Sequence, residues 1–362
     1  MGVYALTLAG SNYFAPIISG FIAEGQGWQW VFYWPAIFNA VTLVFLFFCL
    51  EETNYNRASP IESIQGADPK GEESSKEGFT VHSPAASDAS GVRKKSLAQK
   101  LSIWQPSLGQ NMFIRAKRSL TYLGWPVIFY AGFSYGSYLI WFNVLNATAS
   151  IILSGPPYNF KASMVGLSYV SCCIGVIIGS VVSGRLSDWL TIKLARRNNG
   201  IMEAEHRLWP FAICLVMVAG SLILWGVGAA HEIHWSGLVI GMGCLAFTSC
   251  VGVTISVNYV IDSYHNISGD AIVTVILVRN TMSFAVGYGL VVCMAAVPAQ
   301  LTLRRITPWL TNLGYQNCFV SAAFVGLVAS SVFLLMVKYG KALRERTKER
   351  YWEIVEAESV KR

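Results

Sequence analysis

A single acid stands among several cations in the stretch GRLSDWLTIKLARRNNG, residues 184–200. Asp188 can form ion pairs with Lys193, Arg196 or Arg197. Pairs of this kind near water are weak, so they break and re-form easily. The residue types therefore indicate a reversible electrostatic contact, held together in one state of the protein and parted in another.

Two neighbours of this acid add to the interpretation. Ser187 and Asp188 are residue types that accept backbone N–H groups at the start of a helix. Gly184 has no side chain, so we expect it to let a helix end approach a neighbouring helix closely. The sequence thus predicts a turn at this point, between two hydrophobic segments.

A second group of residues could bind a solute. Arg279 lies about nine residues beyond Asp270, roughly 13 Å along a helix, and is the only charged residue well inside an uncharged segment. A charge so placed faces a cavity or a partner, here with Asn280 beside it, or its long side chain reaches back to the interface. Ring faces and amides that could line a cavity for a flat or cationic solute are Tyr130, Tyr135 and Asn143, with Tyr138, Trp141 and Asn146. Tyr138 and Trp141 are also typical of the membrane interface.

No residue pattern is typical of an enzyme or a metal site. His231 and His234 have only Glu232 nearby, and the eight cysteines show no C-x-x-C spacing. We therefore expect no enzymatic activity, no metal and no cofactor. Proton coupling normally needs a carboxylate inside a span. The acids closest to the spans all lie at span ends, so no coupling group can be assigned: Glu24, Glu232, Asp262 and Asp270.

The elements that must position these residues are transmembrane helices. Apolar residues make up 54% of the chain and charged residues 13%, against about 25% charged in a typical globular protein. A membrane-spanning helix needs about 20 apolar residues, and eight uncharged runs reach that length: 2–23, 25–50, 119–160, 162–184, 208–230, 235–261, 280–303 and 306–337. A soluble helical core would show polar stripes, whereas these runs are apolar all round. We predict an all-α membrane protein with about eight transmembrane helices.

The distribution of Lys and Arg predicts the orientation. With residues 51–118 in the cytosol, the cytosolic segments hold 23 of the 27 Lys and Arg residues, and the outer loops hold only Lys161, Arg304 and Arg305. This is the positive-inside bias. Both termini are then cytosolic, and the net charge of +7 needs no nucleic-acid partner. The cation cluster at 184–200 could serve topology alone, although topology requires no acid.

Composition divides the chain into four parts. We expect residues 1–50 to hold two spans and residues 51–118 to form a cytosolic linker. The linker is expected to be disordered at first and then either an amphipathic interfacial helix or a plain solvated segment. Residues 119–338 hold six spans. Residues 339–362 form a charged cytosolic tail.

Several stretches in this order resemble the major facilitator superfamily, and within it the fungal drug:proton antiporter-like branch. AGSNYFAPIISGFI (9–22) is similar to the antiporter motif of the fifth helix, with Gly10, Pro16 and Gly20 in place and Ala15 where a glycine is usual. GWQWVFYWPAIF (27–38) and LEETNY (50–55) are similar to the sixth helix, and 184–200 is similar to the second copy of the loop motif G-x-L-(S/A)-D with its basic cluster. The stretches similar to the region of the ninth to eleventh helices are NNGIMEAEHRLW (198–209), YVIDSY (259–264) and VILVRN (275–280).

The resemblance implies a function and a departure. It implies alternating-access transport of a small organic solute, such as a drug, a polyamine or another organic cation, with a cytosolic gate at Gly184, Asp188, Lys193, Arg196 and Arg197. The plasma membrane is expected rather than the vacuolar membrane. Twelve helices are usual, so we expect an N-terminally truncated fold that lacks the first four, with residues 1–50 as the last two helices of the N-terminal bundle and 119–338 as the C-terminal bundle. The alternative is a non-transporting remnant or a nutrient receptor of the same family.

Overall fold

The protein folds into helices that follow the uncharged runs. A computed structural model describes residues 2–49, 112–295 and 308–359, and all regular structure in these ranges is helical. The longer helices are α1 (Gly2–Gly25), α2 (Trp30–Cys49), α5 (Met112–Tyr122), α6 (Pro126–Ser154), α7 (Ala162–Ser168), α8 (Val170–Val181), α9 (Ser187–Arg197), α10 (Phe211–Ala230), α11 (Trp235–Ser263), α12 (Ser268–Ala295) and α13 (Pro308–Ser359). The short elements are the π-turn η1 (Val182–Leu186) and the 3-10 turns η2 (Ala204–Leu208) and η3 (His265–Ile267). The predicted all-α fold is confirmed.

Seven segments of the described chain are long and apolar enough to cross a membrane. They are 30–49, 126–154, 162–197, 204–230, 235–263, 265–287 and 316–356. The eighth predicted span, residues 2–23, forms helix α1 but is not one of these seven. Most of the predicted linker, residues 51–111, lies outside the described residues.

The chain forms two compact units, residues 1–31 with 111–362, and residues 32–110. In the smaller unit the described part belongs to α2, and none of the residues of this helix is buried. A helix with apolar side chains exposed all round suits lipid rather than water, because lipid needs no polar surface.

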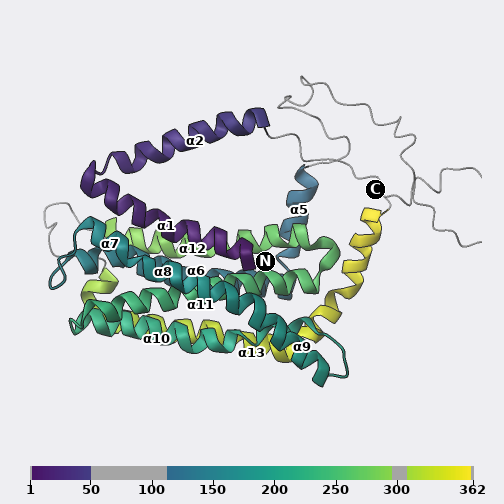
Figure 1. Cartoon of the computed structure of the whole chain (residues 1–362). Coiled ribbons are helices and arrows are strands. Elements are labelled where there is room, and N and C mark those ends of the chain that lie inside the picture. Colours follow the sequence, from purple (N-terminus) through teal and green to yellow (C-terminus); the bar gives the residue numbers. More distant parts are fainter. Residues whose placement is uncertain (1, 50–111, 296–307, 360–362) are drawn as a thin grey trace, which may run out of the picture. The chain divides into compact units, whose positions relative to one another are not determined.

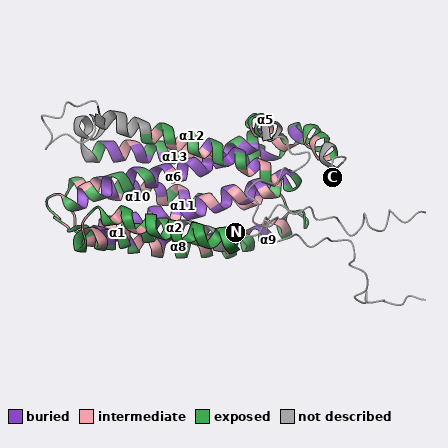
Figure 2. Cartoon of the chain, turned by 90° about the horizontal axis from the view of Figure 1, so that it is seen from above, coloured by how far each residue is buried: buried purple, intermediate pink, exposed green. Residues whose placement is uncertain are grey.

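Helix α11 is the centre of the larger unit. It packs against α1, α6, α8 and α10, and α12 packs against α6. Two views at right angles to each other show these helices running side by side, with buried residues concentrated on α6 and α11 (Figures 1 and 2). Because most of α11 is buried inside protein, its polar side chains face other helices rather than lipid.

Small residues allow the closest helix contacts. Gly175 on α8 lies so near α11 that an added Cβ would be 2.2 Å from the carbonyl oxygen of Gly243. Likewise a Cβ on Gly20 of α1 would meet the backbone of α7 at Ala162 and Gly166. Close packing between membrane helices depends on such residues. Because Gly175 and Gly20 have no side chain, α8 can pack closely against α11, and α1 against α7.

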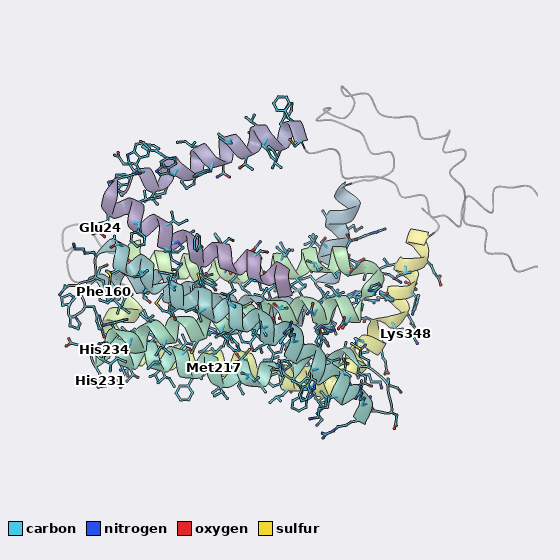
Figure 3. All side chains as sticks on the ribbon, viewed as in Figure 1. Glu24, Phe160, Met217, His231, His234 and Lys348 are labelled. Atoms are coloured by element: carbon cyan, nitrogen blue, oxygen red, sulfur yellow. The ribbon has the colours of Figure 1, made fainter. Side chains whose placement is uncertain are left out.

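The larger unit has two ends. Glu24, Phe160, His231 and His234 lie at one end, and Lys348 lies at the opposite end (Figure 3). Helix α9 lies at the same end as the C-terminal part of α13 (Figure 1). We call the first the His231 end and the second the α9 end.

One local prediction was wrong. Residues 184–197 do not form a turn, because the helix of α8 continues through the π-turn η1 into α9 and ends at Arg197. Asn198 to Glu203 make the actual turn, with Asn199 and Gly200 at positive φ. Because α9 continues η1 without a break, its first residues are not a free helix start, and neither Ser187 nor Asp188 caps one.

Candidate functional site

A polar pocket of about 410 Å³ lies between α1, α6, α11 and α12. Its lining belongs to the larger unit and consists of Asn12, Tyr13, Tyr135, Leu139, Phe142, Asn143, Asn146, Ser249, Cys250, Val253 and Arg279. Tyr135, Asn143 and Arg279 were proposed from sequence as cavity residues, and the fold brings these three together from α6 and α12. Asn12 and Tyr13 of α1 and Ser249 of α11 were not anticipated.

Arg279 is fixed in this pocket by two neighbours. Its Nη1 donates a hydrogen bond of 2.7 Å to the hydroxyl oxygen of Tyr135, and its Nε donates one of 3.0 Å to Oδ1 of Asn280. The guanidinium also lies 4.9 Å from the centroid of the Tyr135 ring, a cation–π contact. The sequence predicted that Arg279 faces a cavity or a partner, and its partner on another helix is Tyr135. Asn280 orients the guanidinium from an exposed position on the same helix.

Hydrogen bonds also fix the polar groups opposite Arg279. The hydroxyls of Tyr13 and Ser249 are 3.0 Å apart, and the Ser249 hydroxyl donates to the carbonyl oxygen of Ala246. Tyr13 must then donate to Ser249, and this bond joins α1 to α11. Asn146 accepts a hydrogen bond from the hydroxyl of Tyr169 through its side-chain oxygen, which leaves its NH2 group as a donor.

Other predicted cavity residues lie elsewhere. Tyr130 is buried but does not line the pocket, and its ring packs edge-on against Tyr259 of α11. Tyr138 stacks on Phe211 with centroids 5.3 Å apart, and its carbon atoms occupy the space beside Gly252. Both rings pack the helices together, a role the sequence pattern cannot distinguish from cavity lining.

The fifth-helix motif has one tightly packed member. Gly20 contacts α7, as described above, whereas a side chain at Gly10 would meet nothing within 4 Å. Pro16 lies inside α1, where Ser19 donates a hydrogen bond to its carbonyl oxygen.

In the predicted ion-pair cluster, Asp188 pairs with a cation other than the three expected partners. Asp188 does not pair with Lys193, Arg196 or Arg197; its carboxylate lies 3.3 Å from Nη1 of Arg207. Arg207 also contacts Asp262 at 2.5 Å. Because Arg207 is only 16% exposed and has acids on two sides, it ties α9 to the end of α11.

The remaining cluster residues point away from this contact. Lys193 lies over the ring of Trp189, with its Nζ 4.6 Å from the centroid. Arg196 and Arg197 are exposed. A Cβ added to Gly184 would meet nothing within 4 Å, so the close helix approach expected there was wrong. Helical spacing explains the correction, because Lys193, Arg196 and Arg197 follow Asp188 on a continuous helix rather than facing it across a turn.

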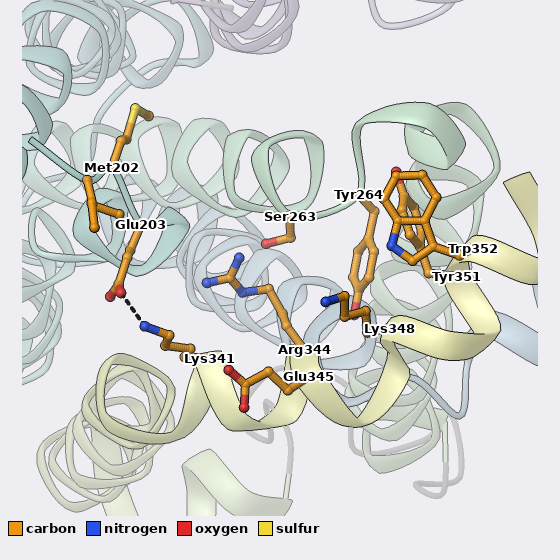
Figure 4. A pocket seen from close by; sticks show the side chains of 11 residues that line it. Met202, Glu203, Ser263, Tyr264, Lys341, Arg344, Glu345, Lys348, Tyr351 and Trp352 are labelled. Atoms are coloured by element: carbon orange, nitrogen blue, oxygen red, sulfur yellow. Dashed lines mark hydrogen bonds and ion pairs between the residues drawn. The ribbon is translucent and has the colours of Figure 1, made fainter.

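A second set of ion pairs joins the start of η2 to α13. The sequence indicated that Glu203, Glu205 and Arg207 extend the charged network around Asp188, but it did not identify the partners on α13. Arg344 donates to both carboxylate oxygens of Glu205, at 2.9 and 2.6 Å, and Glu205 is only 4% exposed. Lys341 donates to Glu203 at 2.8 Å (Figure 4). That hydrogen bond lowers the pKa of Glu203, so its stabilisation is present at neutral pH and is lost as the pH falls through the lowered value.

These pairs adjoin a second, more open pocket of about 370 Å³ at the α9 end. Tyr264, Tyr351 and Trp352 form one side of it (Figure 4), and the hydroxyls of Tyr264 and Thr347 are 2.9 Å apart. Partners so far apart in the chain have no local sequence signal. Among the described residues, no three His, Cys, Asp or Glu side chains gather closely enough to hold a metal ion.

Apolar helices that bury polar side chains around a pocket, with charge at the helix ends, define a multi-pass integral membrane protein. Residues 1–291 match the family model of the Major Facilitator Superfamily. The chain belongs to this superfamily.

Several fungal proteins are similar to this chain. An MFS-type transporter of Schizosaccharomyces pombe is 25% identical over 97% of this chain and 64% of its own length. Protein HOL1 of Saccharomyces cerevisiae is 22% identical over 98% of this chain and 66% of its own, and MFS transporter cpaT of Aspergillus oryzae is 25% identical over 90% and 58%. The chain thus spans between 58% and 66% of the length of these relatives. No solved structure matches it.

Proposed function

We propose that the protein moves a small organic solute across the membrane by alternating access, and that the α1–α6–α11–α12 pocket is part of the solute path. The observation that carries this proposal is Arg279, a charged side chain turned into a polar pocket among helices that otherwise carry charge only near their ends. Such residues inside a membrane bundle mark solute pathways. Superfamily membership supports the same conclusion.

The substrate class is proposed from the relatives and from the resemblance described above. One further relative, Quinidine resistance protein 3 of Saccharomyces cerevisiae, is 26% identical over 64% of this chain and 32% of its own length. Its name concerns a bulky organic base. Together with the likeness to the drug:proton antiporter-like branch of fungi, this favours a drug-like solute, a polyamine or another organic cation, with proton coupling left unassigned.

The same proposal covers domain organisation and location. Residues 1–50 would be the last two helices of an N-terminal bundle, 119–338 the C-terminal bundle, and 51–118 and 339–362 the cytosolic linker and tail. With both termini cytosolic, the α9 end faces the cytosol. The Lys and Arg distribution supports this orientation, and the plasma membrane is the proposed site.

Solute uptake by the purified chain in proteoliposomes tests the function. We expect saturable uptake of at least one radiolabelled solute from a panel of quinidine, spermidine, neutral amides and organic anions, above the rate of protein-free liposomes. No saturable uptake of any member would favour the alternative, a non-transporting remnant or nutrient receptor. The Asn143→Leu variant, altered in the pocket lining, should reduce uptake if this pocket lies on the solute path.

A cytosolic gate is the second element of this proposal. The predicted gate around Gly184, Asp188, Lys193, Arg196 and Arg197 is centred here on the Asp188–Arg207–Asp262 contact, which joins α9 to α11. Because Asp188 is 62% exposed, its pair with Arg207 is worth less than about 1 kcal/mol. A contact so weak can open in every transport cycle.

The Asp188→Asn variant tests the gate. We expect a several-fold change in uptake rate with a change in stability below about 1 kcal/mol, measured by initial uptake rates and thermal unfolding in detergent. The control is Arg196→Gln, which removes an exposed charge outside the contact. If both variants transport like the wild type, the cluster serves only to set topology.

A further inference from the structure

The lining of the pocket is positively charged, whereas a site for an organic cation would be expected to carry a negative charge. Arg279 is the single charged residue among the residues that line it, and no lining residue is a carboxylate. A bound ammonium group would therefore meet a like charge with no acid in the described lining to offset it. At about 6 Å and the effective dielectric of a protein, this repulsion weakens binding roughly a hundredfold.

The aromatic group best placed to hold a cation is already occupied. Tyr135 has the guanidinium of Arg279 4.9 Å from its ring centroid, so this face cannot also accept an ammonium group from a solute. Tyr13 and Phe142 contact each other edge to face, with centroids 4.6 Å apart. Both side chains are largely buried and line the pocket beside its polar groups, where aromatic edges suit contact with a flat ring in the solute.

The hydrogen-bonding groups that remain are mostly donors. Arg279 has five N–H donors, and its two side-chain hydrogen bonds, to Tyr135 and Asn280, use only part of them. Tyr135 accepts from Arg279, which leaves its own O–H to donate, and Asn146 keeps its NH2 group because its oxygen accepts from Tyr169. The hydroxyl of Tyr13, in contrast, is used by Ser249. Donors beside a fixed guanidinium match an acceptor-only carboxylate.

We propose that this pocket binds the carboxylate of an aromatic organic anion, with Arg279 as the residue that sets the charge preference. The inference rests on the proposed transport function, and for this pocket it replaces the organic cation favoured by the relatives with an organic anion. The carboxylate pairs with Arg279 and accepts from Tyr135, and the ring lies against Tyr13 and Phe142. The pocket volume of about 410 Å³ admits a solute of this size.

Three compounds with one indole ring and different charge test this assignment. They are indole-3-propionate, indole-3-propionamide and tryptamine, titrated into the full chain in nanodiscs by calorimetry. We expect the anion to bind at least tenfold more tightly than the neutral amide, and tryptamine to bind most weakly. In the Arg279→Gln variant the preference for the anion over the amide should disappear, whereas Arg279→Lys should keep part of it.

The control is Arg350→Gln, the same substitution at an exposed position on α13, which should leave all three affinities unchanged. Gel filtration of each variant establishes that it is folded. Tightest binding of tryptamine, an anion preference that survives Arg279→Gln, or no binding of any of the three compounds would overturn the inference. If the inference is overturned in this way but a cation is still taken up saturably, the proposed transport function stands. If the anion binds as expected but no solute is taken up, the transport function is contradicted and the assignment of the binding site stands.

Discussion

The Gly175→Ala variant is expected to lose about 3 kcal/mol of stability, at the upper end of the cost of overpacking. Its new Cβ would lie 2.2 Å from the carbonyl oxygen of Gly243 and 3.0 Å from the carbonyl carbon. Both atoms belong to the backbone of α11, so no side-chain rotation can relieve the clash. Helices α8 and α11 must separate by more than an ångström, and α11 is the helix against which most of the others pack.

Thermal unfolding in detergent, followed by fluorescence-detected gel filtration, measures this loss. The matched control is Gly184→Ala, because a Cβ at that position meets nothing within 4 Å. Alanine favours helix over glycine by up to about 1 kcal/mol, so this variant should be as stable as the wild type or slightly more stable. Equal unfolding temperatures for the two variants would show that the contact between α8 and α11 is looser than described.

The hydrophobic runs of the sequence were sufficient to predict the helices. A segment with no charge over more than 20 residues can satisfy its backbone in lipid only as a helix, and the runs at 208–230 and 235–261 coincide closely with α10 and α11. Arg279 was also recognisable, because a charge in an apolar run needs a partner wherever it lies. These inferences depend on local composition, which the sequence displays directly.

The pairings between helices could not be predicted in the same way. Three cations follow Asp188 within nine residues, but they lie further along the same continuous helix, and the contact of Asp188 is with Arg207. Tyr135 and Arg279 are 144 residues apart, and no spacing rule connects them. Tyr130 and Tyr138 show the same limit, since a tyrosine on α6 can face the pocket or a neighbouring helix according to packing alone.

The contact between Glu205 and Arg344 should be the most sensitive charged contact in the larger unit. The two carboxylate oxygens accept from two guanidinium nitrogens at 2.9 and 2.6 Å, which fixes both groups in one geometry. Glu205 is 4% exposed and Arg344 26%. Breaking a buried ion pair costs about 3–5 kcal/mol because the remaining charge is left without a partner. Arg344 keeps some access to water, so we expect Glu205→Ala to cost about 2–3 kcal/mol, below that range.

The neighbouring pair provides the control for Glu205. Glu203 and Lys341 join the same two elements at 2.8 Å, but the Lys341 side chain is 64% exposed, so Glu203→Ala should cost less than about 1 kcal/mol. Thermal unfolding in detergent at neutral pH compares the two variants. The double variant Glu205→Leu with Arg344→Met should recover stability if the loss comes from the unpaired guanidinium, because an apolar pair of similar volume replaces a buried ion pair at little cost. Equal losses for Glu205→Ala and Glu203→Ala would instead mean that burial of the Glu205 carboxylate adds nothing to the attachment of α13.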